Sequence, residues 1–409
     1  MALVQTARPG VATAFAEVAR APSAPPDAAW AHPDEALWAT AYGAAEVREG
    51  TSLRSVLSGL DAPAGLPRRL PGPWFGAASF DGAMGPEWSG FAPLRFTLPA
   101  LLAWRDGGRH LLAAFGDGAQ ARLDAARAAL DRASRPGKPP RAGVRVIHQA
   151  GQRAKWNELV ERALAAIRAG TLDKVVLARA IDVESDAPLR PEALLAALEA
   201  RYPSCRAFLV RGASGVFLGA TPEILCRVDG DRVQADALAG SAAPDQTEQL
   251  SRSAKDLREH RWVVEHITRA LKEVAEHVEW PSEPRVRALA NVAHLYTPVV
   301  ARLGRGRGIA EVAAALHPTP AVGGVPSAAA LRFLAEHEAL DRGLYAGLVG
   351  WVGDGRAELA VALRSALIRG RRARLFVGSG IVEGSSPESE WEETEMKARA
   401  LLDALGARP

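Results

Sequence analysis

The sequence predicts an α+β fold with mainly antiparallel sheets. Paired apolar runs are joined by short turns, as in LCRVDGDRVQADAL at 225–238, where the Asp-Gly pair is typical of a β-hairpin. A second pair consists of ELAVALRSALI at 358–368 and RLFVGSGIV at 374–382, separated by GRRA. Helical segments lie between such strand pairs. Strands joined by hairpins, with helices between them, are typical of α+β proteins.

Residue periodicity predicts the helices and the remaining strands. Helical spacing of apolar residues extends over 153–169, 191–201, 252–277 and 388–405. Further apolar runs of strand length are KVVLARAIDV at 174–183, FLVRG at 208–212 and VFLGA at 216–220.

The N-terminal third has a different character. Its first 131 residues mix short apolar runs with Pro and Gly, which predicts several short antiparallel strands. Residues 132–143, RASRPGKPPRAG, have almost no apolar side chains and are expected to form an exposed connection. We therefore divide the chain into an N-terminal portion, 1–143, and a C-terminal core, 144–409.

Composition excludes several classes of protein. The 409 residues are 48% hydrophobic, enough for a large core, and the net charge is only +3. A nucleic-acid partner would require a concentrated basic patch. The densest group of basic residues lies between two apolar runs, so we interpret it as a hairpin turn; it consists of Arg369, Arg371, Arg372 and Arg374. Two cysteines are too few for a disulfide framework or a Cys-based zinc site. Without a membrane-spanning run or a signal peptide, we expect a cytoplasmic protein, by default a monomer.

Lys174 begins a strand whose same face carries Val176, Ala178 and Ala180. Desolvation on an apolar face disfavours the charged form of a lysine, so this side chain could act as a base near neutral pH. The alternative is a lysine at a strand start that reaches into solvent.

Two further glutamates are candidates. Glu223, in GATPEIL, follows small residues and could serve as a general acid, or could be an outward turn residue. Glu259 lies on the 252–277 helix, on one face with Val263 and His266, where the helix would meet the core. His260 and His266 are better explained as ordinary helix histidines than as ligands.

The C-terminal helix contains the stretch ESEWEETEMK. Glu390, Glu393 and Lys397 share one helix face, whereas Glu388, Glu392 and Glu395 point elsewhere and are expected to be solvated. Two adjacent carboxylates repel each other unless a proton or a metal lies between them. Hard oxygen ligands without Cys or His suit Mg²⁺. Surface pairing of Glu393 with Lys397 is the alternative.

Arg364 is expected on a strand face between Ala362 and Ala366. An arginine in such apolar surroundings needs an anionic partner, which makes it a candidate for binding a substrate carboxylate. Tyr345, in GLYAGLVGWV, is a candidate hydroxyl donor to the same anion.

Eight motifs, in this order along the chain, resemble the chorismate-utilising enzymes, and within them the isochorismate synthase branch. They are KVVLAR, FLGATPEIL, ALAGS, SAKDLREH, LHPTPAVGG, YAGLVGW, ALRSALI and GSGIVEGSSPESEWEETEMK. The resemblance covers about 150–405, and the N-terminal third matches only loosely.

The resemblance implies one large α+β domain of stacked, mostly antiparallel sheets surrounded by helices, with a deep Mg²⁺-dependent site for chorismate. Glu259 and Glu393 would ligate Mg²⁺, with Glu390 beside them. Lys174 would activate water for attack at C2, and Glu223 would protonate the departing C4 hydroxyl. The remaining substrate-binding positions would be Gly240, Ser241, Ala321, Tyr345, Arg364, Gly380 and Lys397.

The branch within the family follows from three positions. Ammonia-using members usually lack a lysine at the position of Lys174, so its presence favours water as nucleophile. Salicylate synthases typically have Thr in place of Ala321 and Lys in place of Ser327. Isochorismate would feed menaquinone or catechol siderophore biosynthesis. A salicylate synthase and a catalytically inactive scaffold stay open as alternatives. One departure from the family is the AAPDQ that follows ALAGS, where many relatives carry an arginine.

Overall fold

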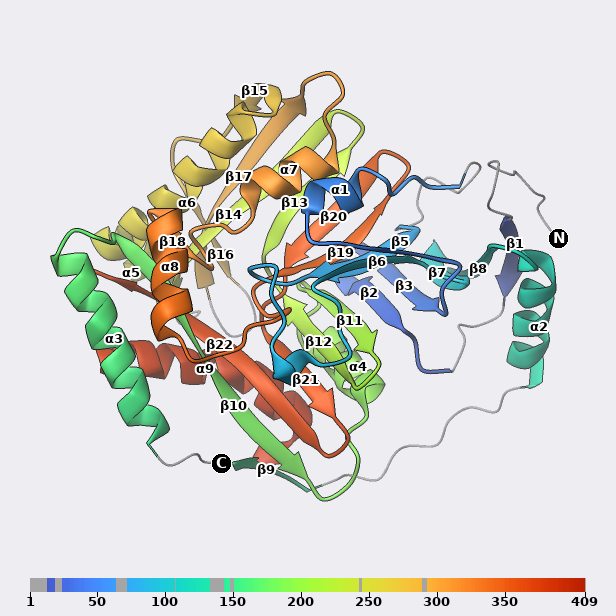
Figure 1. Ribbon diagram of the computed structural model, residues 1–409, viewed down its shortest axis with the longest axis horizontal. Coiled ribbons are helices and arrows are strands. Elements are labelled where there is room, and N and C mark those ends of the chain that lie inside the picture. Colours follow the sequence, from blue (N-terminus) through green and yellow to red (C-terminus); the bar gives the residue numbers. More distant parts are fainter. Residues whose placement is uncertain are drawn as a thin grey trace.

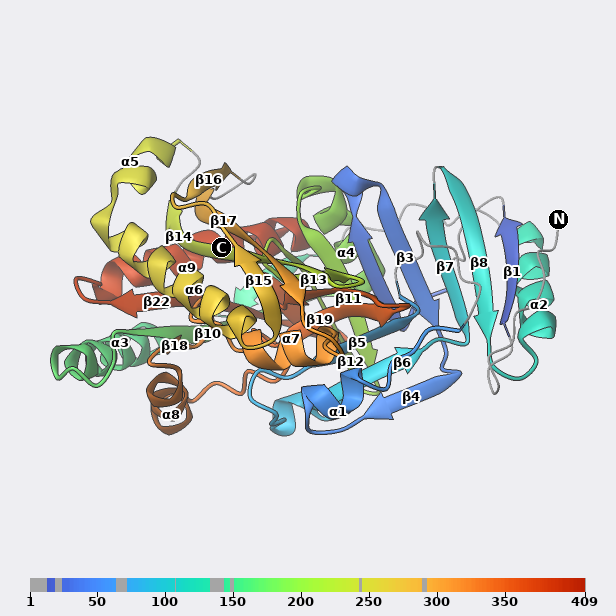
Figure 2. The same ribbon diagram turned by 90° about the horizontal axis from the view of Figure 1, so that it is seen from above.

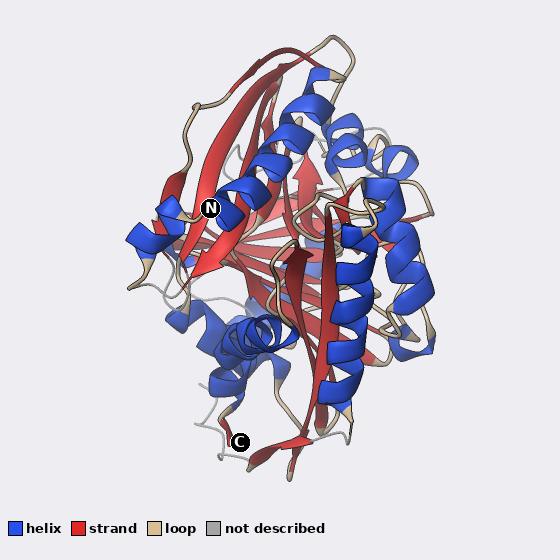
Figure 3. Ribbon diagram, turned by 90° about the vertical axis from the view of Figure 1, so that its left-hand side faces the viewer, coloured by secondary structure: helices blue, strands red, loops and turns tan. Residues whose placement is uncertain are grey.

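The computed structural model describes residues 13–18, 24–63, 72–106, 108–132, 143–147, 151–242, 245–288 and 293–408. Most of the connection expected at 132–143 therefore lies outside the described residues. The α+β prediction is confirmed, because two large and mostly antiparallel sheets form the centre of the molecule and helices cover them (Figure 3).

The first sheet has thirteen strands in the described chain, and all but one of its pairings are antiparallel. The exception is β9 with β23. In spatial order the strands are β1 (Thr13–Val18), β8 (Arg109–Phe115), β7 (Leu101–Asp106), β3 (Leu37–Tyr42), β2 (Ala28–His32), β11 (Arg206–Gly212), β12 (Gly215–Thr221), β21 (Ser365–Arg369), β22 (Arg372–Val382), β10 (Lys174–Ser185), β9 (Val144–Ile147) and β23 (Ala407–Arg408), with β18 (Gly324–Val325) paired to β10.

The second sheet has ten strands in the described chain. In spatial order they are β15 (Ala275–Glu279), β17 (Ala293–Leu303), β14 (Arg232–Ala242), β13 (Ile224–Asp229), β20 (Arg356–Val361), β19 (Leu348–Gly353), β5 (Trp74–Ala78), β6 (Leu94–Leu98) and β4 (Glu46–Glu49), with β16 (Arg285–Ala288) paired to β17. Strands of the N-terminal portion enter both sheets, since β2 pairs with β11 and β5 pairs with β19.

Helices cover the outside of the sheets. They are α1 (Leu53–Leu57), α2 (Ala119–Arg132), α3 (Gln152–Arg168), α4 (Pro191–Arg201), α5 (Thr247–Arg252), α6 (Ala254–Lys272), α7 (Ile309–Leu316), α8 (Ser327–His337) and α9 (Pro387–Leu405). Helix α9 packs on β22 and α3, and α6 packs on β14 and β17 (Figure 1). Helix α2 lies beside β1 at the opposite end of the molecule (Figure 2). In the described residues, no helix is long and apolar enough to cross a membrane.

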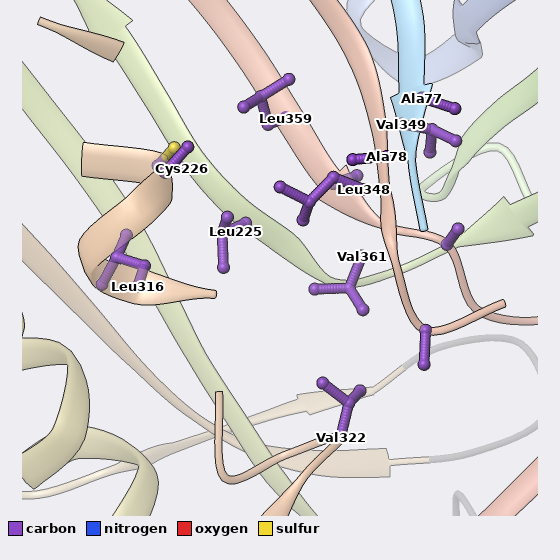
Figure 4. Packing of buried hydrophobic residues seen from close by; sticks show 14 of the residues in the cluster. Ala77, Ala78, Leu225, Cys226, Leu316, Val322, Leu348, Val349, Leu359 and Val361 are labelled. Atoms are coloured by element: carbon purple, nitrogen blue, oxygen red, sulfur yellow. The ribbon is translucent and has the colours of Figure 1, made fainter. Parts of the chain in front are cut away.

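The largest core cluster draws buried residues from both sheets and from the helices that cover them. Leu225, Leu359 and Val361 from strands of the second sheet lie near Leu316 of α7 (Figure 4). All four are at most 3% exposed. This continuous core gives the site a rigid support.

Three of the four predicted helices are confirmed, as α3, α4 and α9. The helix predicted at 252–277 is wrong at its C-terminal end. Helix α6 begins after Ser253, whose side chain accepts a hydrogen bond from the amide of Asp256, and it ends at Lys272, after which the chain forms the edge strand β15.

The single strand predicted at 358–368 is two strands. Strand β20 belongs to the second sheet and β21 to the first, so the chain changes sheets at Ala362–Arg364. Arg364 has a φ of +49°, a left-handed conformation, and does not lie on a strand face. The predicted position of Arg364 between two strand alanines is therefore wrong.

Candidate active site

The site lies beside two of the places where the chain crosses between the sheets. The first crossing, between β12 and β13, carries Glu223. The second, between β20 and β21, carries Arg364. The two crossings are tied together, since the amide of Val361 donates to the carbonyl of Glu223 (3.0 Å) and the hydroxyl of Thr221 donates to the carbonyl of Val361 (2.7 Å).

A cavity of about 930 Å³, including space open to solvent, lies against these crossings. It gathers residues that are far apart in the sequence. Those predicted to form the site that line it are Glu223, Gly240, Glu259, Ala321, Tyr345, Arg364, Gly380, Glu393 and Lys397. Of the other three, Lys174 contacts Glu259, Glu390 contacts Ser379 and Lys255 of the cavity wall, and Ser241 is paired through its backbone with His294. The side chain of Ser241 lies outside what the structure describes.

Lys174 is fully buried, and its ammonium nitrogen is 2.6 Å from Oε1 of Glu259. The alternative that it reaches into solvent is thereby excluded. Gly380, on the strand next to Lys174, makes this contact possible: an added Cβ there would be 2.8 Å from Glu259 Oε1 and 3.1 Å from Lys174 Cε. A side chain at position 380 would push the two charged groups apart.

Glu223 is 6% exposed and lines the cavity. Burial raises the pKa of Glu223 to about 7, and the nearby Lys174 and Lys397 only partly oppose this effect. The side chain therefore carries a proton for a large part of the time at neutral pH. This is the protonation state that a general acid needs.

Glu393 and Lys397 form an ion pair at 2.5 Å, and Lys397 also donates to the carbonyl of Gly378 at 3.1 Å. Burial raises the pKa of Glu393, but Lys397, Lys255 and Ser379 together outweigh that effect and hold the pKa below its usual value. Strand β21 pairs with β22 only as far as Phe376, so the β22 edge at Gly378 is open for these helix side chains. Glu393 thus stays ionised at the cavity.

Glu390 is 1% exposed, and both of its oxygens have partners. Oε1 is 3.0 Å from the ammonium of Lys255 on α6, and Oε2 accepts from the hydroxyl of Ser379 at 2.5 Å. Glu390 does not line the cavity. Its contacts link α6, which carries Glu259, to α9, which carries Glu393.

The C-terminal helix has one contact that was not predicted. Glu395 was expected to be solvated, and its side chain is 44% exposed, but it also forms an ion pair with Arg179, whose side chain is only 7% exposed. The guanidinium of Arg179 also donates to Thr394 and lies 3.7 Å over the ring of Trp391. Glu395 therefore helps to attach α9 to strand β10.

Arg364 points a cationic group at the cavity. Among the described residues its guanidinium has no hydrogen bond or ion pair, and burial lowers its pKa. A desolvated guanidinium without a partner favours an anionic ligand. Tyr345, 4% exposed, lines the same cavity.

The helix histidines are explained without a ligand role, as expected. His260 Nε2 is 2.8 Å from Thr297 Oγ1, and His266 Nε2 is 3.0 Å from the carbonyl of Leu316. Burial lowers the pKa of His260 to about 4, so it is neutral at physiological pH.

Sequence reasoning missed several cavity residues: Lys255, Asp256, His294, Arg342 and Ser379. His294 comes from β17, and burial lowers its pKa to about 3, so its ring is neutral. Lys255 and Asp256 lie in the motif SAKDLREH, one helical turn before Glu259. Their spacing from Glu259 could have predicted that they face the same cavity. His294 has no such local signal.

The carboxylates of this cavity crowd one another. Burial raises the pKa of Asp256, and the nearby Glu259 and Glu393 add to that effect. The described chain has no group of three or more His, Cys, Asp and Glu side chains that could hold a metal by themselves. Two carboxylates with hard oxygen atoms fit Mg²⁺, which usually keeps water or substrate oxygens as its other ligands.

Comparison with known proteins decides the family. The family model described as "Chorismate binding enzyme" matches residues 68–406. The chain belongs to this family. The salicylate biosynthesis isochorismate synthase of Pseudomonas aeruginosa is 38% identical over 339 residues, which cover 78% of this chain and 71% of that protein. The isochorismate synthase MenF of Bacillus subtilis is 34% identical over 349 residues, covering 81% and 74%.

Solved structures agree with the fold. The menaquinone-specific isochorismate synthase MenF from Escherichia coli superposes with a TM-score of 0.81 at 28% identity, covering 97% of this chain and 95% of that one. Anthranilate synthase component I from Streptococcus pneumoniae has a TM-score of 0.75 at 21% identity, which supports the fold alone.

Proposed function

We propose that this protein is an isochorismate synthase, which converts chorismate to isochorismate. The observation that carries the proposal is that one cavity is lined by Glu223, whose pKa burial raises to about 7, and by Glu259, which pairs with the buried Lys174. The reaction needs a proton donor for the departing hydroxyl and a proton acceptor for the attacking water at the same pH. The relatives named as isochorismate synthases support the same assignment.

The two carboxylates of chorismate have separate partners in this proposal. Arg364, Tyr345 and Lys397 bind the enolpyruvyl carboxylate, because the unpartnered guanidinium of Arg364 faces the cavity. Gly240, Ser241, Ala321 and Gly380 complete the binding surface. Small residues there allow the ligand to approach the backbone closely.

Glu259 and Glu393 would hold Mg²⁺. Glu390 would support them, because it contacts Lys255 and Ser379 of the cavity wall and so connects the two helices that carry Glu259 and Glu393. Bound Mg²⁺ would neutralise and orient the ring carboxylate of chorismate. Glu390 has both oxygens occupied, so we assign it a supporting contact in place of direct ligation.

In the proposed chemistry, Lys174 accepts a proton from the water whose oxygen bonds to C2. Glu223 donates a proton to the C4 hydroxyl, which leaves as water while the ring double bonds shift. Proton count is conserved, because one proton enters the protein at Lys174 and another leaves it at Glu223. As the proton acceptor in this step, Lys174 would have to react as the neutral amine.

Product analysis tests this function. Purified protein is incubated with chorismate and Mg²⁺ at neutral pH, and the products are separated by chromatography. Isochorismate as the main product supports the proposal. Salicylate with pyruvate would support the salicylate synthase alternative, and no turnover would support an inactive scaffold. The cytoplasmic location, the monomeric state and the lack of a nucleic-acid partner stay predictions.

A further inference from the structure

The N-terminal portion contacts a segment of the active site directly. Residues Asp341–Tyr345 contain Arg342 and Tyr345, two residues that line the cavity. Two aromatic residues from the first 143 residues, Phe80 and Trp88, pack against this segment. The sequence assigned no role to either of them.

Trp88 holds the segment through its indole ring. The side chain is 0% exposed, and its Nε1 donates to the carbonyl of Asp341 at 3.1 Å. The ring also lies against Gly343, which has a φ of +49°; an added Cβ there would be only 2.2 Å from the indole. Position 343 therefore requires glycine because of its positive φ and because a side chain would clash with the indole. The backbone of the segment lies in direct contact with Trp88.

A stack of rings connects Trp88 to Tyr345. Trp88 and Phe376 stack with centroids 5.4 Å apart and an interplanar angle of 23°, and Phe376 and Tyr345 stack at 5.3 Å and 17°. Gly378 faces the end of this stack, since an added Cβ there would be 2.9 Å from the tyrosine hydroxyl. The plane of the Tyr345 ring therefore follows the plane of Trp88.

Phe80 provides a second attachment. Its amide donates to the carbonyl of Gly343 at 2.9 Å, and the guanidinium carbon of Arg342 lies 4.4 Å from its ring centroid. Arg342 in turn donates to the carbonyls of Val176 and Val322 at the cavity wall. The segment is thus held on one side by the N-terminal portion and on the other by the catalytic core.

We propose that Trp88 is a positioning residue for substrate binding: it fixes the orientation of Tyr345 through Phe376 and the path of the backbone at Asp341–Gly343. This inference rests on the proposed function, because Tyr345 is assigned there to the enolpyruvyl carboxylate. It gives the divergent N-terminal portion a part in substrate affinity. Trp88 lines no part of the cavity itself, so its effect must pass through the ring stack with Phe376 and Tyr345 and through the backbone at Asp341–Gly343.

The test compares two buried tryptophans of the same N-terminal portion. Trp88→Leu should raise the KM for chorismate roughly tenfold, because a small misplacement of a binding group costs affinity. It should leave kcat within about twofold and the Kd for Mg²⁺ unchanged, because Trp88 contacts neither the acid and base nor the metal ligands. Trp104→Leu is the matched control, because Trp104 is 1% exposed but lies on β7, away from the cavity.

Both variants lose a large buried side chain, so a rise in KM for Trp88→Leu alone supports the proposal. An unchanged KM, or an equal rise in both variants, would overturn it. If Trp88→Leu does not fold, Trp88→Phe replaces it, because the phenyl ring keeps part of the stack but loses the hydrogen bond to Asp341. Calorimetry measures chorismate binding by both variants without turnover. The role of Trp88 in substrate binding can therefore be tested even if the protein does not form isochorismate.

Discussion

Lys174 and Glu259 form a buried ion pair, with Nζ 2.6 Å from Oε1 and side chains that are 1% and 14% exposed. Glu259 is also one of the two carboxylates that fit a divalent cation. In the proposed site, this carboxylate would pair with Lys174 in the metal-free protein and would bind the metal in the active one. Metal binding and release of Lys174 from its ion pair would then be coupled.

Removing Lys174 should consequently improve metal binding while it destroys catalysis. Lys174→Met eliminates a positive charge that competes for Glu259, so the Kd for Mg²⁺ should fall severalfold. Turnover should decrease by roughly 10²- to 10⁴-fold, the usual effect of losing a general base. Calorimetric titration with Mg²⁺ and an assay of isochorismate formation measure both. Lys155→Met, an exposed lysine of α3, is the control. Weaker Mg²⁺ binding in Lys174→Met would contradict the shared role of Glu259.

Glu223 should determine the alkaline side of the pH profile. Burial raises its pKa to about 7, and the protonated form is the one that donates to the C4 hydroxyl. Protonated Glu223 is present below this pKa and disappears as the pH rises through it, so kcat should fall about tenfold per pH unit above pH ~7. Glu223→Gln should be slower by roughly 10²-fold or more and should lack this decline. A wild-type kcat that stays constant up to pH 9 would exclude Glu223 as the acid.

Glu393 should be needed for the metal, unlike its neighbour Glu392. Glu393→Gln removes one of the two anionic ligands that we propose and should weaken Mg²⁺ binding at least tenfold. Glu392 is exposed, so Glu392→Gln should bind Mg²⁺ normally. Glu395 is unsuitable as a control because of its pairing with Arg179. Equal Mg²⁺ affinities of the two variants, measured by calorimetry, would place the metal elsewhere.

Arg364→Lys should weaken chorismate binding although it preserves the charge. A guanidinium can form two parallel hydrogen bonds with a carboxylate, and an ammonium cannot. We expect the KM to rise about tenfold or more, with a smaller change in kcat. Arg369→Lys, at the turn of the β21–β22 hairpin, changes the same residue type outside the cavity. A KM that increases in neither variant would leave Arg364 without its assigned ligand.

Local periodicity predicted much of the fold. Residue spacing alone predicted the hairpins and three of the four helices. It also predicted the helix face that carries Glu390, Glu393 and Lys397. Arg364 shows where this reasoning fails. ELAVALRSALI reads as one alternating strand, but the chain changes sheets within it, and only contacts distant in sequence reveal the change.

The candidate site was predicted mainly through the motif resemblance. Periodicity placed Lys174 on an apolar strand face, but Glu259 as its partner comes from a helix 85 residues away. His294 and Trp88 lie in stretches without any local signal of a site. The ion pair of Glu395 with Arg179 was not predicted, because helix phase identifies the exposed face but not the strand residue that contacts it.

Glu358 should be a main determinant of stability, separate from catalysis. This carboxylate is 4% exposed and accepts hydrogen bonds from Arg206 Nε (2.7 Å), Arg227 Nε (2.5 Å) and Trp30 Nε1 (3.1 Å). It joins the two sheets, because Arg206 and Trp30 belong to the first sheet and Arg227 and Glu358 to the second.

Glu358→Ala leaves the buried guanidinium of Arg206 without its main counter-charge, so the free energy of unfolding should decrease by about 3–5 kcal/mol. Denaturant titration measures this decrease. Glu158→Ala, which removes only the exposed pair with Arg162, should leave the unfolding midpoint nearly unchanged. Glu358 does not line the cavity, so the folded fraction of Glu358→Ala should retain its KM for chorismate. A loss below about 1 kcal/mol would mean that water or Glu35, which also pairs with both arginines, replaces the missing carboxylate.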